Sequence, residues 1–407
     1  MVVQWKEQRK NMSRNIAVGI DIGTYQVKVV VSELVKENGK QISHIIGTGL
    51  TESKGLRHGY IINSSDITES IETAVKMAEK MSGIKIHKTF VAVGGIGLSS
   101  ITGTASTIIA RADCQVTELD IEKLSQICEE SLPATLTQNR KILHSIPLSY
   151  KIDGKPVLAK SPLDMKGSKL EMKMLFVTCL EGHLNDLLEA VEKAGVDVID
   201  TLASPIAASF VILSKQQKMV GCVLANIGAE TISIVVFENN IPISLEVFPI
   251  GGSDITNDIA LGLKIPLEEA ESLKIGSFGS GSFSKKRLEE IIAARLYDMF
   301  ELIENHLKKI GRNGLLPAGI FLSGGGSGIG TIEDLAKIAL KLPSRLGVIN
   351  GQSVSGGKNN IKDSTWAVAY GLCMLGLSTE EKTHLGILNK IKKLIEKISD
   401  WLGKFLP

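Results

Sequence analysis

A short pattern of glycine, acid or amide, and β-branched residues occurs twice in the sequence, and it has the chemistry of a phosphate site. Residues 18–24 read Val-Gly-Ile-Asp-Ile-Gly-Thr, and residues 223–229, at a constant offset without a gap, read Val-Leu-Ala-Asn-Ile-Gly-Ala. Each copy leads from an apolar run through a glycine turn into a β-branched run, which predicts a β-hairpin. Bare N–H groups of such a turn can surround an anion, and a nearby carboxylate or amide can hold a cation through water. Two hairpins therefore predict two related domains that bind one nucleotide phosphate chain; two ordinary core hairpins are the alternative.

A third glycine-rich segment follows a predicted strand in the second half of the chain. Ile320 to Leu322 reads as a buried strand, and Ser-Gly-Gly-Gly-Ser at residues 323–327 separates it from a helix. Thr331 is the expected cap of that helix, with Asp334 at the third position. A glycine loop between strand and helix lets a ligand approach the backbone closely, although a tight turn alone would have the same composition.

Two more helices lie between the second hairpin and this glycine segment. Residues 249–254 form a glycine turn that opens the first of them, with Asp254 as its expected N-cap. The second carries Glu271 and Lys274 one turn apart and runs into a Gly/Ser-rich stretch at residues 276–282. That stretch predicts a flexible loop.

The elements after the first hairpin predict one domain with an insert. Asp66 and Glu69 have the spacing of a capping box, and Gly83 is expected to end the helix that they begin. Residues 90–178 then follow a strand, helix, strand, strand pattern, which predicts a small α+β insert. His144 in this block is expected to pack rather than to bind metal, because no acid, cysteine or histidine is spaced as a partner ligand.

Two helices are expected between the insert and the second hairpin. One runs from His183 to Ala194 and ends at Gly195, a C-cap signal. The other runs from Pro205 to Leu213, with Ser204 as its expected N-cap. The polar residues that follow mark a domain boundary before the second hairpin.

Length and composition exclude several classes of protein. The 407 residues suffice for two or three domains, and 43% hydrophobic with 22% charged residues is ordinary for a globular protein. A net charge of +2 gives no global basic field, so we expect no nucleic-acid partner. The five cysteines lack CxxC spacing, which argues against a disulfide framework or a zinc site. The first 14 residues have no apolar core of a secretory signal; they are expected to be a disordered tail, and translation could start at Met1 or Met12.

The end of the chain predicts an amphipathic helix on a membrane surface. A last domain helix is expected over residues 363–377, followed by a polar linker at residues 378–386. In residues 387–407 five lysines face two acids, a balance of +3, so the segment is expected to lie in the membrane interface rather than to span it. The alternative is a helix docked on the protein itself or on a partner helix. The apolar residues at helical spacing are Ile387, Leu388, Ile391, Leu394, Ile395, Ile398, Trp401, Leu402 and Phe405.

Taken in order, these motifs resemble the superfamily of actin, Hsp70 and sugar kinases. Two phosphate hairpins, a Glu-x-x-Lys helix and a third glycine loop carry that resemblance. Within the superfamily, the chain is similar to the FtsA family of bacterial cell-division proteins over roughly residues 15–377, and the terminal helix extends the likeness. The segments that carry it are Phe-Pro-Ile-Gly-Gly-Ser-Asp-Ile-Thr-Asn-Asp-Ile-Ala at residues 248–260, Glu-Glu-Ala-Glu-Ser-Leu-Lys at 268–274, Gly-Leu-Arg-His-Gly at 55–59, His-Ser-Ile-Pro at 144–147 and Met-Lys-Gly-Ser-Lys-Leu at 165–170.

The resemblance implies an α/β protein with an actin-like two-domain ATPase fold. A small α+β insert in the first domain would replace the usual actin subdomain, and a C-terminal amphipathic helix would follow the fold. The expected divisions are a tail at 1–14, domain 1 at 15–89 and 179–217 closed by the helix at 363–377, the insert at 90–178, the domain 2 core at 218–255 and 315–362, an outer subdomain at 256–314, the linker at 378–386 and the membrane helix at 387–407.

The resemblance also implies ATP and Mg²⁺ as ligands. Asp21 would face magnesium-bound water beside the first phosphate turn, Glu271 and Lys274 would meet the ribose and adenine, and the glycines at 324–326 would pass beneath the adenosine. No catalytic residue is assigned. The expected nucleotide contacts are Asp21, Gly23, Thr24, Tyr25, Asn226, Gly228, Ala229, Thr231, Gly252, Glu271, Lys274, Gly324, Gly325 and Gly326.

Partners follow from the same likeness. FtsA-like proteins bind ATP, polymerise into filaments and tether the tubulin-like division protein FtsZ to the cytoplasmic face of the inner membrane at the division septum. We therefore expect self-association, an anionic membrane surface, other division proteins and the FtsZ C-terminal tail as partners. That tail would dock on residues 256–314.

Three departures from the superfamily pattern affect the expected chemistry. Asn226 stands where an Asp is usual, so an oxygen acceptor remains but the charge that helps to hold magnesium and activate water is lost. Glu230 adds a negative charge beside the phosphates, which is unfavourable unless it points away. Residues 201–213 contain no acid, amide or histidine that could position water. We expect ATP binding with slow hydrolysis at most.

Two other functions share the expected fold. A pilus-assembly scaffold of the PilM kind is the first alternative, and it usually lacks a terminal membrane helix. A sugar or acid kinase is the second, but it needs a catalytic Asp in the first domain's cleft, and no convincing candidate is present in the insert.

Overall fold

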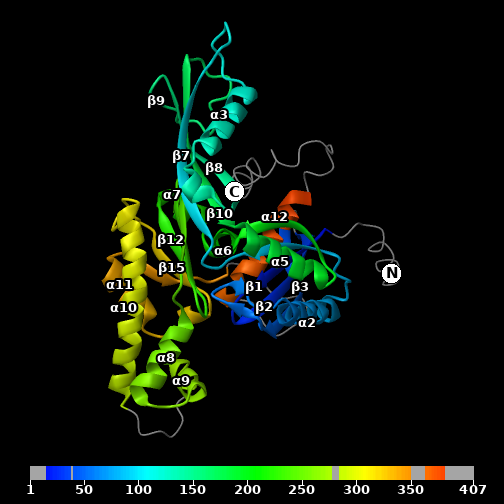
Figure 1. The fold of residues 1–407 in the computed structure, drawn as a ribbon, viewed down its shortest axis with the longest axis vertical. Helices are drawn as coiled ribbons and strands as arrows, with labels where there is room; N and C mark the ends of the chain where they lie inside the picture. The colour runs from blue at the N-terminus through cyan, green and yellow to red at the C-terminus, as the bar shows by residue number, and fades with distance from the viewer. Residues whose placement is uncertain (1–14, 38–39, 277–283, 350–362, 381–407) are drawn as a thin grey trace.

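The computed structural model describes residues 15–37, 40–276, 284–349 and 363–380. Within them, two five-stranded sheets lie side by side and a four-stranded sheet projects at one end, while the helices α8 (Gly252–Leu263) and α9 (Leu267–Lys274) occupy the opposite end (Figure 1). The predicted C-terminal membrane helix and most of the predicted loop at 276–282 lie outside the described residues.

The first sheet has the order β11-β6-β1-β2-β3. Strands β1 and β2 form the first hairpin, and β3 continues it as a third antiparallel strand. Strands β6 and β11 run parallel to β1. Helices α2 and α5 contact one another and this sheet, and α12 packs on β1, β2 and β6. The strands are β1 (Ile16–Ile22), β2 (Gln26–Glu37), β3 (Lys40–Glu52), β6 (Lys88–Val93) and β11 (Asp197–Ala203); the helices are α2 (Ser64–Ser82), α5 (Glu181–Lys193) and α12 (Ala367–Glu380).

The second sheet repeats the topology of the first. Its order is β14-β13-β12-β15-β16, again an antiparallel run of three strands followed by two strands parallel to the first. Helix α10 contacts α8 and α11 beside this sheet. The elements are β12 (Cys222–Ile227), β13 (Ile232–Glu238), β14 (Ile241–Phe248), β15 (Gly319–Ser323), β16 (Ser344–Leu346), α8 (Gly252–Leu263), α9 (Leu267–Lys274), α10 (Lys285–Lys309), α11 (Ile332–Leu340) and the 3₁₀ turn η1 (Gly325–Gly328).

The apolar run of β12 is continuous because both of its faces are buried. Val223, Ala225 and Ile227 face the core under α8, α10 and α11. Leu224 faces the larger core that the second sheet shares with the first. Helix α6 (Ser204–Ile212) contacts strands of both sheets, so it joins the two halves, and α7 (Lys215–Val220) follows it.

The four-stranded sheet belongs to the predicted insert and has the order β7-β10-β8-β9. Helix α3 covers it and closes a small core around Leu124 and Phe176. Its elements are β7 (Ser99–Ile108), α3 (Glu118–Glu130), α4 (Ala134–Thr137), β8 (Arg140–Ile152), β9 (Lys155–Pro156) and β10 (Lys169–Leu180). Because β6 pairs with β1 in the first sheet, the predicted start of the insert at residue 90 is wrong, and we place it after Val93.

Helix starts required the most correction. Asn63, not Asp66, caps α2, because its Oδ1 accepts N–H groups of the first turn and lets the helix begin earlier. Gly83 ends α2 in the left-handed conformation, as predicted. Asp254 is the third residue of α8 and its carboxylate accepts the Gly251 N–H at 2.7 Å, so it is not the N-cap.

Two further helix starts differ from the prediction in position, and a third lacks the predicted cap. Ser204 is the first residue of α6 rather than its cap. Thr331 precedes α11 as predicted, but its side chain makes no capping hydrogen bond. The last described helix, α12, starts at Ala367 instead of residue 363, because a 3₁₀ turn, η2 (Ser364–Trp366), comes first and the Asp363 side chain caps that turn.

Candidate functional site

The two glycine turns have the same backbone geometry. In the first hairpin, the Gly23 N–H donates to the Gln26 carbonyl at 3.1 Å. In the second, the Gly228 N–H donates to the Thr231 carbonyl at 2.8 Å, at the corresponding positions. A Cβ on either glycine would lie 3.1 Å from that same carbonyl oxygen. The predicted repeat is therefore two β-hairpins closed by the same turn.

The strand residues that precede the turns differ in charge. Asp21 lies opposite Lys28 in the first hairpin, and Asn226 lies opposite Ser233 at the matching register of the second. Burial raises the pKa of the Asp21 carboxyl to about 6, and the nearby Lys28 ammonium opposes that rise. A charged pair in the first half thus corresponds to a neutral pair in the second.

A magnesium ion fits this arrangement only if the protein supplies one or two ligands and water and phosphate supply the others, as is usual with nucleotides. Within the described part of the chain, no cluster of three or more His, Cys, Asp or Glu residues could hold a metal by itself. Mg²⁺ commonly takes one or two carboxylates and completes its shell with water and phosphate oxygens. Asp21 can supply such a carboxylate, because its charge is poorly solvated and a cation would stabilise the ionised form.

The second turn is fixed by the N-terminus of α8. The Gly252 N–H donates to the Gly228 carbonyl at 2.9 Å, and the Ser253 N–H donates to the Ala229 carbonyl at 2.7 Å. The first N–H groups of the helix therefore bind the turn itself. Gly252 belongs to the predicted site as a brace of the second turn, and its N–H is already used.

The third glycine segment packs directly on the end of β12. A Cβ on Gly324, whose φ is +83°, would overlap the Asn226 side chain and the Ile227 carbonyl. Gly326 approaches the Ile227 side chain in the same way. Such a close approach of backbones requires glycine at both positions. Gly325 has open space around it and is free to face a ligand.

Glu271 and Lys274 meet in a polar cluster beneath α8. The Lys274 ammonium donates to Glu271 Oε2 at 2.6 Å, Thr256 Oγ1 at 2.9 Å and the Gly252 carbonyl at 3.1 Å. Thr256 Oγ1 also donates to Glu271 Oε2 at 2.5 Å. The Lys274 side chain is 11% exposed and that of Glu271 is 48% exposed, so the carboxylate is the member that a ligand can reach. The cluster joins the glutamate and lysine to Gly252, as one site would require.

The remaining predicted contacts are less enclosed. Tyr25 is 64% exposed, and its carbonyl accepts the Ser53 N–H, so the structure leaves its ring mostly in solvent. Thr24, Ala229 and Thr231 lie in the two turns with half-buried side chains. The predicted membrane residues, Ile387 to Phe405, lie outside the described residues. In the part of the chain that is described, no helix is both long and apolar enough to cross a membrane.

Two residues of the site were not predicted from the sequence. Thr256 forms hydrogen bonds with both Glu271 and Lys274. The sequence feature that could have indicated this role is its position four residues, or about one helical turn, after Gly252. His58 binds Glu230, with its N–H donating to Glu230 Oε2 at 2.5 Å. Glu230 therefore points towards the first half of the protein. His58 had a weak signal only, in the Gly-Leu-Arg-His-Gly motif.

Helix α6 contains none of the water-positioning residues that the sequence analysis found missing from residues 201–213. All residues of α6 except Phe210 are buried, and none is an acid, amide or histidine. His144 approaches the start of this helix from the insert, and its Nε2 accepts the Ala203 N–H at 3.1 Å. Its environment is buried and apolar, as expected of a packing residue.

Solved structures with the same fold include proteins of the actin-like class. The PilM-PilN type IV pilus biogenesis complex matches with a TM-score of 0.65 at 18% identity, over 89% of this chain and 98% of that chain. MreB5 of Spiroplasma citri bound to ADP matches with a TM-score of 0.52 at 12% identity, over 91% and 99%. The chain has an actin-like α/β fold, and its insert matches the family model of the SHS2 domain inserted in FtsA over residues 95–178.

Sequence relatives give the family. The model of the cell division protein FtsA matches residues 223–371. The cell division protein FtsA of Borreliella burgdorferi is 30% identical over 410 aligned residues, covering 95% of this chain and 95% of the relative. The same protein of Pseudomonas aeruginosa is 29% identical over 389 aligned residues, covering 90% and 91%. With two matched glycine turns, an SHS2 insert and this likeness along nearly its whole length, the chain belongs to the FtsA family of cell-division proteins.

Proposed function

We propose that this protein binds ATP with Mg²⁺ between its two glycine turns and acts as a polymerising adaptor of cell division. The observation that carries the proposal is the pair of turns that are closed by the same backbone hydrogen bond in two sheets with the same topology. One turn supplies the carboxylate of Asp21 and the other the amide of Asn226. Both rows of N–H groups can then surround one phosphate chain.

The nucleoside would lie against the second half. The half-exposed carboxylate of Glu271 is suited to accept hydrogen bonds from ribose hydroxyls, since an ionised carboxylate acts only as an acceptor. Lys274 would position that carboxylate rather than contact the ligand directly, because the three N–H donors of its ammonium group already have acceptors within the protein. Gly324, Gly325 and Gly326 would form the floor beneath the adenosine. ADP is bound in the solved structure of MreB5, which shares the fold.

Recruitment to the division site would use two separate segments of the chain's second half. Residues 387–407 would form the membrane helix, with its apolar face in the lipid interface and its lysines on anionic headgroups. The FtsZ C-terminal tail would dock on residues 256–314, and self-association would build filaments. The protein would then tether the FtsZ ring to the cytoplasmic face of the inner membrane at the septum and help to recruit other division proteins.

Co-sedimentation with anionic lipid vesicles tests this function. The full chain is compared with a variant ending at Thr383, each with and without ATP and Mg²⁺, and with purified FtsZ present or absent. We expect the full chain to pellet with the vesicles and to carry FtsZ with it, and the shorter chain to stay in the supernatant. Neutral vesicles are the control for the charge contribution. Equal pelleting of both chains, or of neither, would contradict the membrane anchor.

A pilus-assembly scaffold is the second candidate function. It is favoured by the TM-score of 0.65 to the PilM-PilN complex, but at 18% identity that likeness concerns the fold alone. The two functions differ in partner, so pelleting of FtsZ by the full chain separates them. If the full chain neither binds vesicles nor retains FtsZ, the pilus scaffold becomes the better-supported function.

A further inference from the structure

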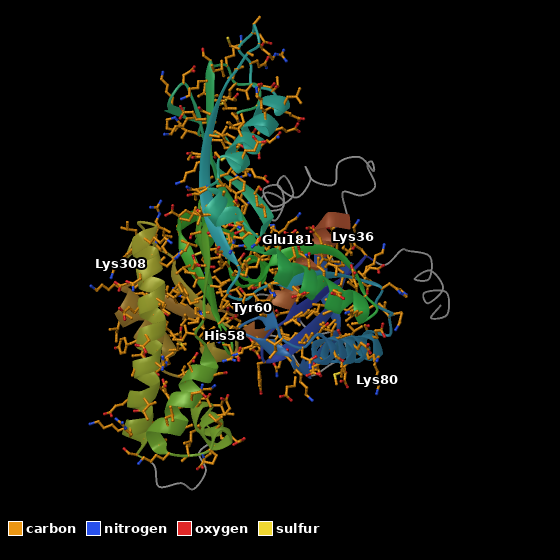
Figure 2. All side chains as sticks on the ribbon, viewed as in Figure 1. Lys36, His58, Tyr60, Lys80, Glu181 and Lys308 are labelled. Atoms are coloured by element: carbon orange, nitrogen blue, oxygen red, sulfur yellow. The ribbon has the colours of Figure 1, made fainter. Side chains whose placement is uncertain are left out.

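The small hairpin β4 (Leu56–Arg57) and β5 (Tyr60–Ile61) of the first half reaches the second glycine turn of the other half. Its two central residues, His58 and Gly59, have φ values of +48° and +84°. Positive φ at both positions is the geometry of a type I′ turn, which makes a narrow and rigid hairpin tip. Figure 2 shows His58 and Tyr60 where the first half meets the strands of the second.

Two hydrogen bonds join the hairpin tip to Glu230. The His58 N–H donates to Glu230 Oε2 at 2.5 Å, and the His58 Nδ1 lies 3.3 Å from the Glu230 carbonyl oxygen. The Glu230 side chain is 30% exposed, so its charge is partly desolvated. A bond from a backbone N–H to an ionised carboxylate is stronger than one between neutral groups. This contact connects parts of the chain 172 residues apart.

The far side of the tip is fixed within the first half. A Cβ on Gly59 would overlap the Gly95 backbone, so the tip packs directly on the segment after β6. The Gly55 carbonyl accepts the N–H groups of Ile62 at 2.8 Å and Asn63 at 3.1 Å, which joins the hairpin to the start of α2. The tip is therefore a rigid extension of the first half. Glu230, which lies in the second glycine turn, is bound to this tip.

We propose that Glu230 and His58 form a latch that sets the spacing of the two phosphate turns. Glu230 lies between Ala229 and Thr231 of the second turn, so the latch fixes the position of that turn relative to the first half of the protein. Glu230 and His58 are positioning residues in this scheme, and they act on the nucleotide only through the turn. The proposal rests on nucleotide binding at the two turns.

The latch can be tested without nucleotide by the distance between the halves. Spin labels on cysteines replacing the exposed Met77 of α2 and Leu267 of α9 report this distance in double electron–electron resonance. We expect one narrow distribution for the parent chain and a broader or longer one for Glu230→Ala. Glu238→Gln is the matched control, because Glu238 has a similarly exposed side chain but pairs with Arg312 of its own half. An unchanged distribution in Glu230→Ala overturns the latch whether or not the protein binds nucleotide.

Release of a fluorescent ATP analogue, mant-ATP with Mg²⁺, tests the effect on the site. We expect release from Glu230→Ala to be about tenfold faster, the change for losing one charge-assisted hydrogen bond. Glu230→Gln keeps an acceptor oxygen and should lose less. His58→Gly keeps both the turn and the backbone N–H, so it should be the mildest of the three. Equal release rates in all three variants and in Glu238→Gln would overturn the latch, whereas no mant-ATP binding by the parent chain would overturn nucleotide binding instead.

Discussion

At the residue scale, the two glycine turns differ at one matched pair of side chains. Asp21 faces Lys28, whereas Asn226 faces Ser233, so the second half lacks the carboxylate that would help to hold magnesium and orient water. The backbone of both turns is the same. If both turns bind phosphate, binding would depend on N–H groups that both turns share, whereas hydrolysis would depend on a charge that only the first half carries.

Restoring that charge should therefore raise ATP hydrolysis. We expect Asn226→Asp to increase phosphate release at saturating ATP and Mg²⁺ by about tenfold, which corresponds to roughly 1.4 kcal/mol of barrier. Asn239→Asp adds the same charge to an exposed turn of the same half and is the control. The parent chain should turn over far more slowly than ~10 per second, a typical enzyme rate. A parent rate of that size, or no gain in Asn226→Asp, would contradict this account of the departure.

His144 makes a second residue-scale prediction, on stability. Burial lowers the pKa of its imidazole from 6.5 to about 4, and its Nε2 must stay unprotonated to accept the Ala203 N–H. Because the unfolded chain binds a proton more readily, the stabilisation is complete above pH 6.5 and is lost as the pH falls towards 4. The free energy at stake is about 3 kcal/mol at most. His306, whose pKa is also lowered to about 4, acts in the same direction.

Thermal melting from pH 7.5 down to about 4.5 measures this effect. His144→Gln keeps an acceptor for the Ala203 N–H but cannot be protonated, so its melting temperature should fall less steeply with acid than that of the parent. His87→Gln, at an exposed histidine, should follow the parent curve. Parallel curves for all three proteins would show that His144 does not titrate on unfolding.

At the element scale, α12 is packed against its neighbours through glycines. A Cβ on Gly19 of β1 would overlap the Ala369 carbonyl, and one on Gly371 would overlap the Ala207 carbonyl of α6. We expect Gly371→Ala to destabilise the fold by about 1–3 kcal/mol, because backbone atoms must move apart. Gly182 of α5 has open space around it, so Gly182→Ala should be neutral or stabilising by up to about 1 kcal/mol. The free energy of unfolding of both variants is measured by urea unfolding. A loss of stability in both would mean that the close contact at Gly371 is not the cause of the destabilisation.

The elements were largely predictable from the sequence, and their ends were not. The apolar and β-branched runs on either side of each glycine turn predicted the two hairpins, because side chains alternate between the two faces of a strand. The start of α2 was missed because Asp66 and Asn63 are both good caps and only tertiary packing selects between them. The pairing of β6 with β1 was missed because strand partners distant in sequence leave no local signal.

The site was predictable as segments and less so as contacts. The glycine turns and the Glu-x-x-Lys helix are local patterns, and the structure brings Gly228, Gly252, Lys274 and Gly326 into one region. The partner of Glu230 was not predictable, because a hydrogen bond to the backbone N–H of His58 does not depend on the side chain at that position. Thr256 was overlooked for a related reason, since a threonine within a helix is usually a neutral residue.

At the scale of the whole molecule, the repeated sheet topology suggests how one ligand could control assembly. Two sheets of the same topology meet at two matched turns, so a nucleotide between them would bind both halves and fix their relative position. Helix α6 contacts both sheets and would transmit that position. A filament needs each copy in one conformation, and a bound nucleotide supplies the free energy to select it.

Membrane attachment should then depend on assembly through avidity. Burial of the nine large apolar side chains in residues 387–407 would favour membrane binding, and the lysines would add attraction to anionic lipid. Ordering the segment costs conformational entropy, which offsets much of that gain. One copy would therefore bind reversibly, and a filament with many copies would bind strongly.

The corresponding measurement is vesicle binding as a function of protein concentration, with and without ATP and Mg²⁺. We expect ATP to lower the concentration for half-maximal binding by about tenfold or more, and to do so only above the concentration at which filaments form. Asp21→Asn, which removes the expected magnesium-facing carboxylate, should bind vesicles as the parent does without ATP. Filaments that form with ATP but bind vesicles no better than monomers would show that assembly and membrane residence are independent, since avidity requires many anchors to act together.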